Sequence, residues 1–361
     1  MLTEAGTISS AEGSNHGSSD LKLLPRGGGA DGAMMKHAWS RRLITIPIVY
    51  LAFALATLLI PLVLVAGAAI DGMRWIASRT PAMALRMAAF GWVYLLGEVW
   101  AIPTLAVTGL LPKDRSIAVT YRLQMIWLNW NLNTVRVVFR LRFTADAADE
   151  IPPAPILVLS RHASLIDTLL PGRYVTEPFG MRLRYVLKSE LLMDPALDIA
   201  GNRLPNVFVD RGGDTDREIA AIRDLATTMP DGEGLLIYPE GTRYSEAKRV
   251  NYTEKLARRG DATGEIASTY QRVLPPRPAG TLAMLDARPL DVVVMAHRGL
   301  EGFAEIRDIW SGGLVGSAVH VRFWRIPSSE IPADDADRRL WLFTTWSDVD
   351  AWVTAEGEHA G

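Results

Sequence analysis

Two long apolar stretches dominate the first third of this chain. The first, residues 43–70, contains no charged residue. A helix of that length would extend roughly 42 Å, more than the ~30 Å hydrocarbon core of a membrane requires. The second stretch, residues 81–111, contains only Arg86 and Glu98 as charged residues. A carboxylate in such a segment needs a partner or water, so Glu98 is expected to face other parts of the protein.

The two stretches predict a membrane anchor. A helical hairpin that crosses the membrane twice is favoured, and the alternative is one span followed by a helix embedded against the membrane. Pro47 and Pro61 are expected to kink the first helix or to mark its ends. A cleaved signal peptide is disfavoured, because the segment before the apolar stretch and the stretch itself are both too long. The flanking basic residues are Arg26, Lys36, Arg41 and Arg42 before the hairpin, Lys113, Arg115 and Arg122 after it, and Arg74 and Arg79 in the connection. Because basic residues favour the cytoplasmic side, both ends of the hairpin and the part of the chain that follows it are predicted to be cytoplasmic.

The hydrophobic pattern divides the chain into three parts. Residues 1–40, rich in Gly, Ser and Ala, are predicted to be a disordered tail. Residues 41–112 are predicted to be the membrane anchor of one or two apolar helices, and residues 113–361 a separate domain, to which the candidate catalytic residues described below belong. Within the last part, residues 116–133 are predicted to form an amphipathic helix, and residues 135–143 alternate like a half-buried strand.

Beyond residue 150, short apolar runs alternate with helical patterns. Strands are predicted at 156–160, 183–187, 206–210, 234–238, 290–296 and 317–325, and helices at 165–173, 214–228, 245–259, 278–286 and 338–355. Such alternation is typical of an α/β fold in which helices sandwich a mainly parallel sheet.

Composition narrows the functional classes. The net charge of −2 provides no global basic field for nucleic acid. The chain has no cysteine, which excludes disulfides, thiolate catalysis and Cys-ligated metal sites. No clustered His, Asp and Glu spacing indicates a metal, and neither a dinucleotide fingerprint nor a phosphate-binding loop is present.

His162 and Asp167 are the first candidates for chemistry. The apolar run 156–159 predicts a buried strand that delivers His162 onto a loop, and Asp167 lies at or near the start of the following helix. Imidazole and carboxylate would then touch. A neutral imidazole takes a proton from a hydroxyl group, and a carboxylate orients it and stabilises the imidazolium ion. A histidine with an aspartate five residues later is also common by chance.

Two further strands end in charged residues. Residues 207–211 end in Asp210 and Arg211, and residues 235–243 run from a buried strand into Pro239-Glu240-Gly241-Thr242-Arg243. Ligands bind at the carboxyl ends of parallel strands, and an arginine there can grip an anionic group with its planar fork. Solvated charges at ordinary turns are the alternative.

These motifs, in this order, resemble the first three blocks of the glycerolipid acyltransferases, the PlsC-like lysophosphatidic acid acyltransferases. The blocks are His162-x4-Asp167, Phe208–Arg211 and Pro239–Arg243. The segment Tyr185–Leu191 is similar to the family's lysine-bearing segment. Tyr244–Lys248 together with Leu274–Gly280 resemble segments of the branch that includes eukaryotic lysophospholipid acyltransferases. One departure is the fourth block, an apolar strand that usually contains proline and here, at residues 292–298, has none.

The resemblance implies transfer of an acyl group from acyl-CoA or acyl carrier protein, as co-substrate and without a cofactor, to a lysolipid or glycerol phosphate hydroxyl. His162 would be the general base and Asp167 its partner, and backbone amides at the following helix start would stabilise the oxyanion. The other implied site residues are Arg211, Arg243 and Lys188 for the acceptor phosphate, Glu240, Gly241 and Thr242 for the acceptor pocket, and Arg277. The expected partners are membrane lipid and acyl-CoA, with no nucleic acid; the oligomeric state stays open.

Two alternatives remain open from the sequence. One is a membrane-tethered lipid hydrolase, although the chain lacks a Gly-x-Ser-x-Gly nucleophile elbow. The other is an inactive lipid-binding protein that keeps the fold. The presence of both His162 and Asp167 argues against it.

Overall fold

The computed structural model describes residues 30–147, 151–210, 215–303 and 306–355. Two compact units are distinguished, residues 1–41 and residues 42–361. In the first unit, residues 30–41 are described and are helical. The tail predicted over residues 1–40 therefore lies mostly outside the described residues, and its last part is helix.

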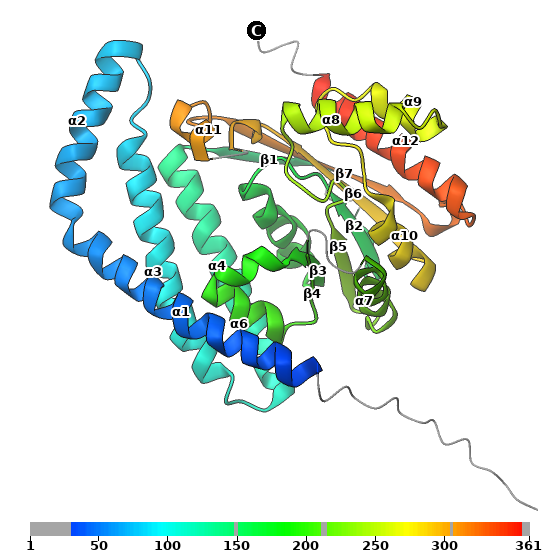
Figure 1. Ribbon diagram of the computed structural model, residues 1–361, viewed down its shortest axis with the longest axis horizontal. Helices are drawn as coiled ribbons and strands as arrows, with labels where there is room; N and C mark the ends of the chain where they lie inside the picture. The colour runs from blue at the N-terminus through cyan, green and yellow to red at the C-terminus, as the bar shows by residue number, and fades with distance from the viewer. Residues whose placement is uncertain (1–29, 148–150, 211–214, 304–305, 356–361) are drawn as a thin grey trace, which may run out of the picture. The chain divides into compact units, whose positions relative to one another are not determined.

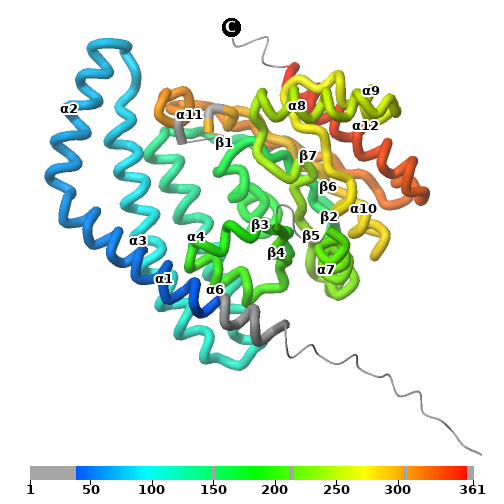
Figure 2. The backbone as a smooth tube through the Cα atoms, viewed as in Figure 1, coloured from blue at the N-terminus to red at the C-terminus, as the bar shows by residue number. Residues whose placement is uncertain are grey.

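Three helices carry the apolar N-terminal stretches: α1 (Ala30–Leu58), α2 (Ile60–Ser78) and α3 (Ala84–Thr108). By length and composition, three segments could cross a membrane, namely Ala38–Leu58, Ile60–Ser78 and Ala84–Thr108. The helix expected over residues 43–70 is interrupted at Leu59, because Pro61 lacks a backbone N–H and stands in the first turn of α2. The predicted pair of helices is thus three helices, of which α2 and α3 run side by side (Figure 2).

Glu98 attaches α3 to the rest of the protein. Its side chain is buried and accepts hydrogen bonds from Trp127 Nε1 of α4 (Lys113–Phe139), at 3.1 Å, and from the backbone N–H of Ala196, at 3.2 Å. Ala196 lies in α6 (Pro195–Arg203), so one carboxylate joins three helices. The partner expected for Glu98 inside an apolar segment is therefore supplied by the protein.

A seven-stranded sheet forms the centre of the chain after residue 141 (Figure 1). Its spatial order is β1-β7-β6-β2-β5-β3-β4, and only the β6–β7 pair is antiparallel. The strands are β1 (Arg142–Asp146), β2 (Ile156–Ser160), β3 (Arg182–Lys188), β4 (Val207–Val209), β5 (Glu233–Ile237), β6 (Asp291–Arg298) and β7 (Ala318–Ile326). The fold class predicted from the sequence, a mainly parallel sheet between helices, is confirmed.

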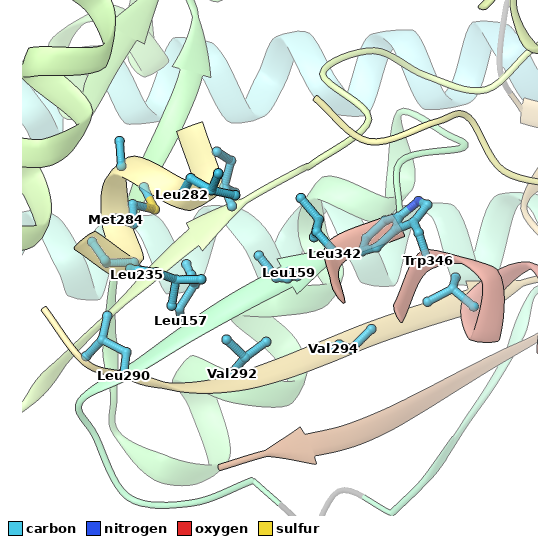
Figure 3. Close-up of a cluster of buried hydrophobic side chains, with 14 of the residues drawn as sticks. Leu157, Leu159, Leu235, Leu282, Met284, Leu290, Val292, Val294, Leu342 and Trp346 are labelled. Carbon is cyan, nitrogen blue, oxygen red and sulfur yellow. The ribbon is translucent and has the colours of Figure 1, made fainter. Parts of the chain in front are cut away.

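Hydrophobic side chains cover both faces of the sheet. Along β2, Leu157 and Leu159 belong to one cluster, whereas Ile156 and Val158 belong to another. The first cluster packs against α7 (Thr215–Thr227), α10 (Pro278–Ala287) and α12 (Asp335–Thr354), and includes Trp346 (Figure 3). The second packs against α4. Since β2 is buried on both faces, its sequence is continuously apolar rather than alternating.

Several elements differ from the sequence predictions. The strand predicted at residues 135–143 is wrong, because α4 continues to Phe139 and β1 begins only at Arg142. Val135 and Phe139, four residues apart, both face the core, which is the spacing of a helix rather than a strand. The helix predicted at 165–173 is a 3-10 turn, η2 (Ile166–Leu169), followed by a π-helical turn, η3 (Gly172–Thr176). The remaining helices are α5 (Glu177–Phe179), α8 (Glu246–Ala257), α9 (Ala262–Ser268) and α11 (Ile306–Ser311).

Candidate active site

The candidate site lies at the carboxyl edge of the parallel strands. Strand β2 ends at Ser160 and β5 at Ile237, and the two strands pair in parallel, as do β5 with β3 and β3 with β4. The loops that follow these strands carry His162 after β2 and Glu240 after β5. Because parallel strands end at the same edge, residues 78 positions apart in the chain meet there.

His162 and Asp167 are in direct contact. Nδ1 of His162 lies 2.9 Å from Oδ1 of Asp167. The other carboxylate oxygen, Oδ2, accepts the backbone N–H groups of Ala163 at 2.7 Å and Ser164 at 2.6 Å. The chain therefore curls around Asp167 immediately after the histidine, and the spacing of five residues is what allows one side chain to bind both the ring and the turn.

The backbone amides around this turn have local partners. Those of Ala163 and Ser164, which precede η2, donate to Asp167, and that of Ile166 donates to Ser164 Oγ at 3.1 Å. An oxyanion role for the helix-start amides stays a prediction.

The electrostatics favour an ionised Asp167. Burial alone would raise the pKa of this carboxyl, but the charge of His162 and hydrogen bonds from His162 and His297 hold the pKa well below its usual range. A carboxylate that accepts from Nδ1 fixes the ring tautomer, so Nε2 is the nitrogen without a proton. The His162 side chain is 13% exposed, and no hydrogen bond to Nε2 is found among the described residues. Nε2 is thus available as a proton acceptor.

Glu240 supports the loop that carries His162. Its Oε1 accepts the backbone N–H of His162 at 3.1 Å, and its Oε2 accepts that of Leu274 at 3.3 Å. The side chain is fully buried. Burial raises the pKa of Glu240 to about 7, although the neighbouring Arg161 guanidinium opposes this effect.

Gly241 makes the turn after Glu240 possible. Its φ is +65°, a conformation that L side chains resist, and its N–H donates to the carbonyl of Tyr238 at 2.9 Å. A Cβ atom at this position would lie 3.0 Å from Cδ of Arg277. The N–H of Arg277 in turn donates to the Pro239 carbonyl at 2.7 Å, so the turn is clamped from two sides.

Most of the predicted site residues lie together around His162 and the Glu240 turn, whereas Lys188 lies on another strand and Arg211 is not described. His162, Asp167 and Glu240 are joined by hydrogen bonds, and the Glu240 turn also contains Gly241, Thr242 and Arg243 and contacts Arg277. Lys248 links the turn to α8 by donating to Thr242 Oγ1 at 3.3 Å and to the Arg243 carbonyl at 2.9 Å. Lys188 ends β3, beyond β5 in the sheet order from β2. Arg211 lies outside the described residues, so its predicted role is untested.

Arg277 has a partner of its own. Its Nη2 donates to the hydroxyl of Tyr252 on α8 at 3.1 Å, and the guanidinium lies 5.6 Å from the centre of the Tyr252 ring. This contact holds the arginine beside the Glu240 turn, and its role in the site stays a prediction.

Two buried residues of the site were not predicted. Arg161 is 0% exposed and donates from Nη1 to the His297 carbonyl at 2.5 Å and to Glu301 Oε1 at 2.7 Å. Its Nη2 donates to the Arg272 carbonyl at 2.9 Å. His297, also 0% exposed, is the residue before the last of the apolar strand β6. The available signal was a polar residue next to an apolar run, which in isolation does not distinguish a site residue from a strand end.

Comparison with known proteins supports the resemblance. Residues 142–284 match the family model described as Acyltransferase. A 1-acyl-sn-glycerol-3-phosphate acyltransferase from Pseudomonas aeruginosa is 30% identical over 152 residues, which cover 40% of this chain and 53% of that protein. The mouse 1-acyl-sn-glycerol-3-phosphate acyltransferase gamma is 28% identical over 218 residues, which cover 58% and 55%. The chain spans about half the length of the curated relatives it matches.

Among solved structures, the chain is similar to the 1-acyl-sn-glycerophosphate acyltransferase PlsC from Thermotoga maritima. The TM-score is 0.49 at 13% identity, with 75% of this chain and 96% of that chain covered. Together, the family model over residues 142–284 and the relatives support the resemblance to the PlsC-like glycerolipid acyltransferases.

Proposed function

We propose that this protein is a membrane-bound O-acyltransferase. It transfers a fatty acyl group from acyl-CoA or acyl carrier protein to the hydroxyl of a lysophospholipid or an acylglycerol phosphate. The single observation that carries this proposal is the His162–Asp167 pair at the carboxyl edge, with Nε2 of the histidine unpaired among the described residues. The names of the relatives, which are 1-acyl-sn-glycerol-3-phosphate acyltransferases, support an acylglycerol phosphate as acceptor.

The reaction follows from that geometry. Nε2 of His162 takes the proton of the acceptor hydroxyl as its oxygen attacks the thioester carbonyl carbon. Asp167, ionised and 2.9 Å from Nδ1, stabilises the imidazolium ion that forms. When the tetrahedral intermediate collapses, the carbon–sulfur bond breaks and the thiolate receives the proton from Nε2. The protein ends each cycle in its starting protonation state.

Charge neutralisation at the acceptor is the second element of the proposal. Arg243 follows β5 and Lys188 ends β3, so both basic residues belong to the edge at which His162 lies. A phosphate beside the attacking hydroxyl requires such cations, and arginine supplies directional hydrogen bonds. We assign the acceptor phosphate to Arg243, Lys188 and Arg211, and the acceptor pocket to Glu240, Gly241 and Thr242.

The third element is the membrane. The three apolar helices supply enough length and apolar surface for an integral anchor, and large apolar side chains are exposed along them, among them Leu62, Val65 and Ile76 of α2. The basic residues Lys113, Arg115 and Arg122, which follow the last of these helices, favour a cytoplasmic catalytic domain. A lysolipid acceptor would then be drawn from the membrane.

An assay with the purified full-length protein in detergent tests the activity. Acyl-CoA is supplied with and without 1-acyl-glycerol-3-phosphate, and both thiol release and diacyl product are measured. We expect thiol release only when acceptor is present, with one product molecule formed for each thiol. Equal thiol release without acceptor would identify a hydrolase, and binding of acyl-CoA without turnover would identify an inactive binding protein.

A further inference from the structure

His297 is a second imidazole at the carboxylate of Asp167. It lies near the end of β6, the strand that replaces the proline-containing fourth block of the family, and it is 0% exposed. Its Nε2 is 3.3 Å from Oδ2 of Asp167 and 3.2 Å from the carbonyl oxygen of Arg161. The histidine is therefore buried behind Asp167 and has no contact with solvent.

The two neighbours of Nε2 define its proton. Both the Asp167 carboxylate and the Arg161 carbonyl are acceptors, so Nε2 carries the hydrogen and donates. The other ring nitrogen, Nδ1, is buried and has no hydrogen-bond partner among the described residues. A second proton there would be an unpaired buried donor, which is costly. His297 thus fits this position as a neutral ring that donates from Nε2.

Asp167 consequently accepts from several donors at once. Oδ1 accepts from His162, while Oδ2 accepts from two backbone N–H groups and faces the ring of His297. Donors that share one carboxylate share its negative charge. Each additional donor leaves less of that charge to attract the proton that His162 takes up during the reaction.

We propose that His297 is a positioning residue that acts through Asp167 and sets the pH range in which His162 is available as a base. By donating to Oδ2, it weakens the hold of the carboxylate on the His162 proton and keeps the base unprotonated to lower pH. This inference rests on the proposed role of His162 as general base. Hydrogen bonds to Asp167 from both histidines contribute to the low pKa of that carboxyl, which keeps it ionised throughout the working range.

Other charged groups also face this pair. Arg161 directly precedes His162, and its carbonyl oxygen accepts from His297 Nε2. Glu301 forms an ion pair with the Arg161 guanidinium at 2.7 Å. Glu240 binds the backbone of His162, and the Tyr238 ring lies with its centre 4.7 Å from that of His162. Of these, Glu240 needs separate control, because its pKa of about 7 falls inside the range to be measured.

A purely structural role for His297 is the competing explanation. His297 and Arg161 form two reciprocal contacts. The carbonyl of His297 accepts from Arg161 Nη1 at 2.5 Å, and the carbonyl of Arg161 accepts from His297 Nε2 at 3.2 Å. These contacts hold β6 to the loop after β2. A merely structural histidine would affect folding and overall activity but not the pH dependence of the base.

The test compares the wild-type protein with His297→Leu and His297→Met, which remove the donor, and with His297→Gln, which keeps an N–H donor. Each change is made in the full-length protein and also together with Glu240→Gln. The acidic limb of the kcat/KM profile should move to higher pH by about one unit in the Leu and Met variants, the equivalent of one modest hydrogen bond. The Gln variant should stay close to wild type. KM for both substrates, measured on the plateau, should be unchanged.

A second readout does not need turnover. Diethyl pyrocarbonate modifies only the unprotonated ring, and peptide mass spectrometry identifies modification at His162. The pH dependence of the modification rate at His162 should shift by the same amount as the acidic limb of the kcat/KM profile. If wild type transfers no acyl group, the proposed function fails, but the modification profiles still decide the role of His297.

Several outcomes would overturn the inference. It fails if the folded Leu and Met variants keep the wild-type limb, or if His297→Gln shifts as far as they do. It also fails if the shift disappears in the Glu240→Gln background, since Glu240 would then be the titrating group. If neither donorless variant folds while His297→Gln does, His297 is structural.

Discussion

The backbone N–H of His162 donates to Oε1 of Glu240, across 3.1 Å and 78 positions of sequence. The bond is made by the main chain of the proposed base, so it fixes the loop rather than the ring. Glu240 also accepts from Leu274, and the N–H of Tyr244 donates back to the His162 carbonyl at 2.8 Å. The loop after β2 and the turn after β5 are therefore held together by hydrogen bonds. A change in either should alter the position of the His162 imidazole.

Replacing Glu240 with glutamine should change how stability depends on pH. The pKa of Glu240 is raised to about 7 from its ordinary 4.5, so the folded protein binds this proton more tightly than the unfolded chain. The stabilisation is fully present below pH ~4.5 and is lost as the pH rises through ~7, an effect on the order of 3 kcal/mol. Thermal melting at several pH values should show that wild type loses stability between pH 5 and 7 relative to Glu240→Gln.

The matched control for this experiment is Glu254→Gln. Glu254 lies on α8 with a side chain that is 60% exposed and a 3.6 Å contact to Arg258. Its substitution should leave the pH dependence as in wild type. A Glu240→Gln protein whose melting temperature follows wild type across this range would contradict the assignment.

Arg243→Ala should weaken use of the acceptor. A charge-assisted hydrogen bond contributes roughly 1.5–3 kcal/mol, so the acceptor KM should rise about 10- to 100-fold while the donor KM changes little. Arg243→Lys should restore only part of this, since lysine offers a point charge without a fork. Steady-state kinetics with both substrates varied is the measurement.

The control for Arg243 is Arg258→Ala, because the Arg258 side chain is 80% exposed at the end of α8. If Arg243 instead holds the Glu240 turn together, its loss would lower the melting temperature and reduce activity with both substrates alike. An unchanged acceptor KM, or equal use of a lysolipid without phosphate, would rule out the phosphate contact.

Asp350 should matter for stability although it lies far along the chain in α12. Its buried carboxylate accepts the backbone N–H groups of Gln271, Arg272 and Val273 at 2.6–3.0 Å. That loop carries the Arg272 carbonyl, which binds Arg161, and leads to Leu274, which binds Glu240. Asp350→Ala should cost about 2–4 kcal/mol, because three donors lose their acceptor.

Thermal denaturation of Asp350→Ala beside Asp348→Ala checks this prediction. Asp348 is on the same helix and exposed. A melting temperature that falls equally in both variants, or in neither, would show that the carboxylate of Asp350 does not anchor the loop.

The apolar helices should behave as an integral membrane anchor. Carbonate treatment should leave the full-length protein in the membrane pellet, because three segments are long and apolar enough to span the lipid. The chain has no cysteine, so Arg258→Cys provides a unique label on the catalytic domain. A membrane-impermeant thiol reagent should label it only after cells are opened. Labelling in intact cells would show that the orientation is the reverse of the predicted one. Release of the protein into the supernatant by carbonate would refute the membrane anchor.

Much of the fold could be predicted because its central strands are short, continuous runs of apolar residues. Residues 156–160 are apolar at every position except the last, since β2 is covered on both faces. The strand expected at 135–143 failed for the opposite reason. Its alternation of apolar and basic residues also fits a helix in which Val135 and Phe139 point inward, and the packing of α4 decided between the two.

The site could be predicted only where its residues are close in sequence or where the resemblance supplied them. The contact of His162 with Asp167 is local and is present as predicted. Arg161, His297 and Asp350 act through partners 77 to 140 positions away, so no local pattern marks them. Their roles depend on which strands become neighbours, and that information appears only once the sheet is assembled.

The most direct test of the account is acyl transfer by His162→Ala. The variant is compared with wild type and with His320→Ala, whose ring contacts Thr144 between β1 and β7, outside the site. Loss of a general base should lower kcat by about 10²-fold or more while the melting temperature and acyl-CoA binding stay near wild type. His320→Ala should keep full activity. A folded His162→Ala protein that transfers acyl groups at the wild-type rate would contradict the central claim.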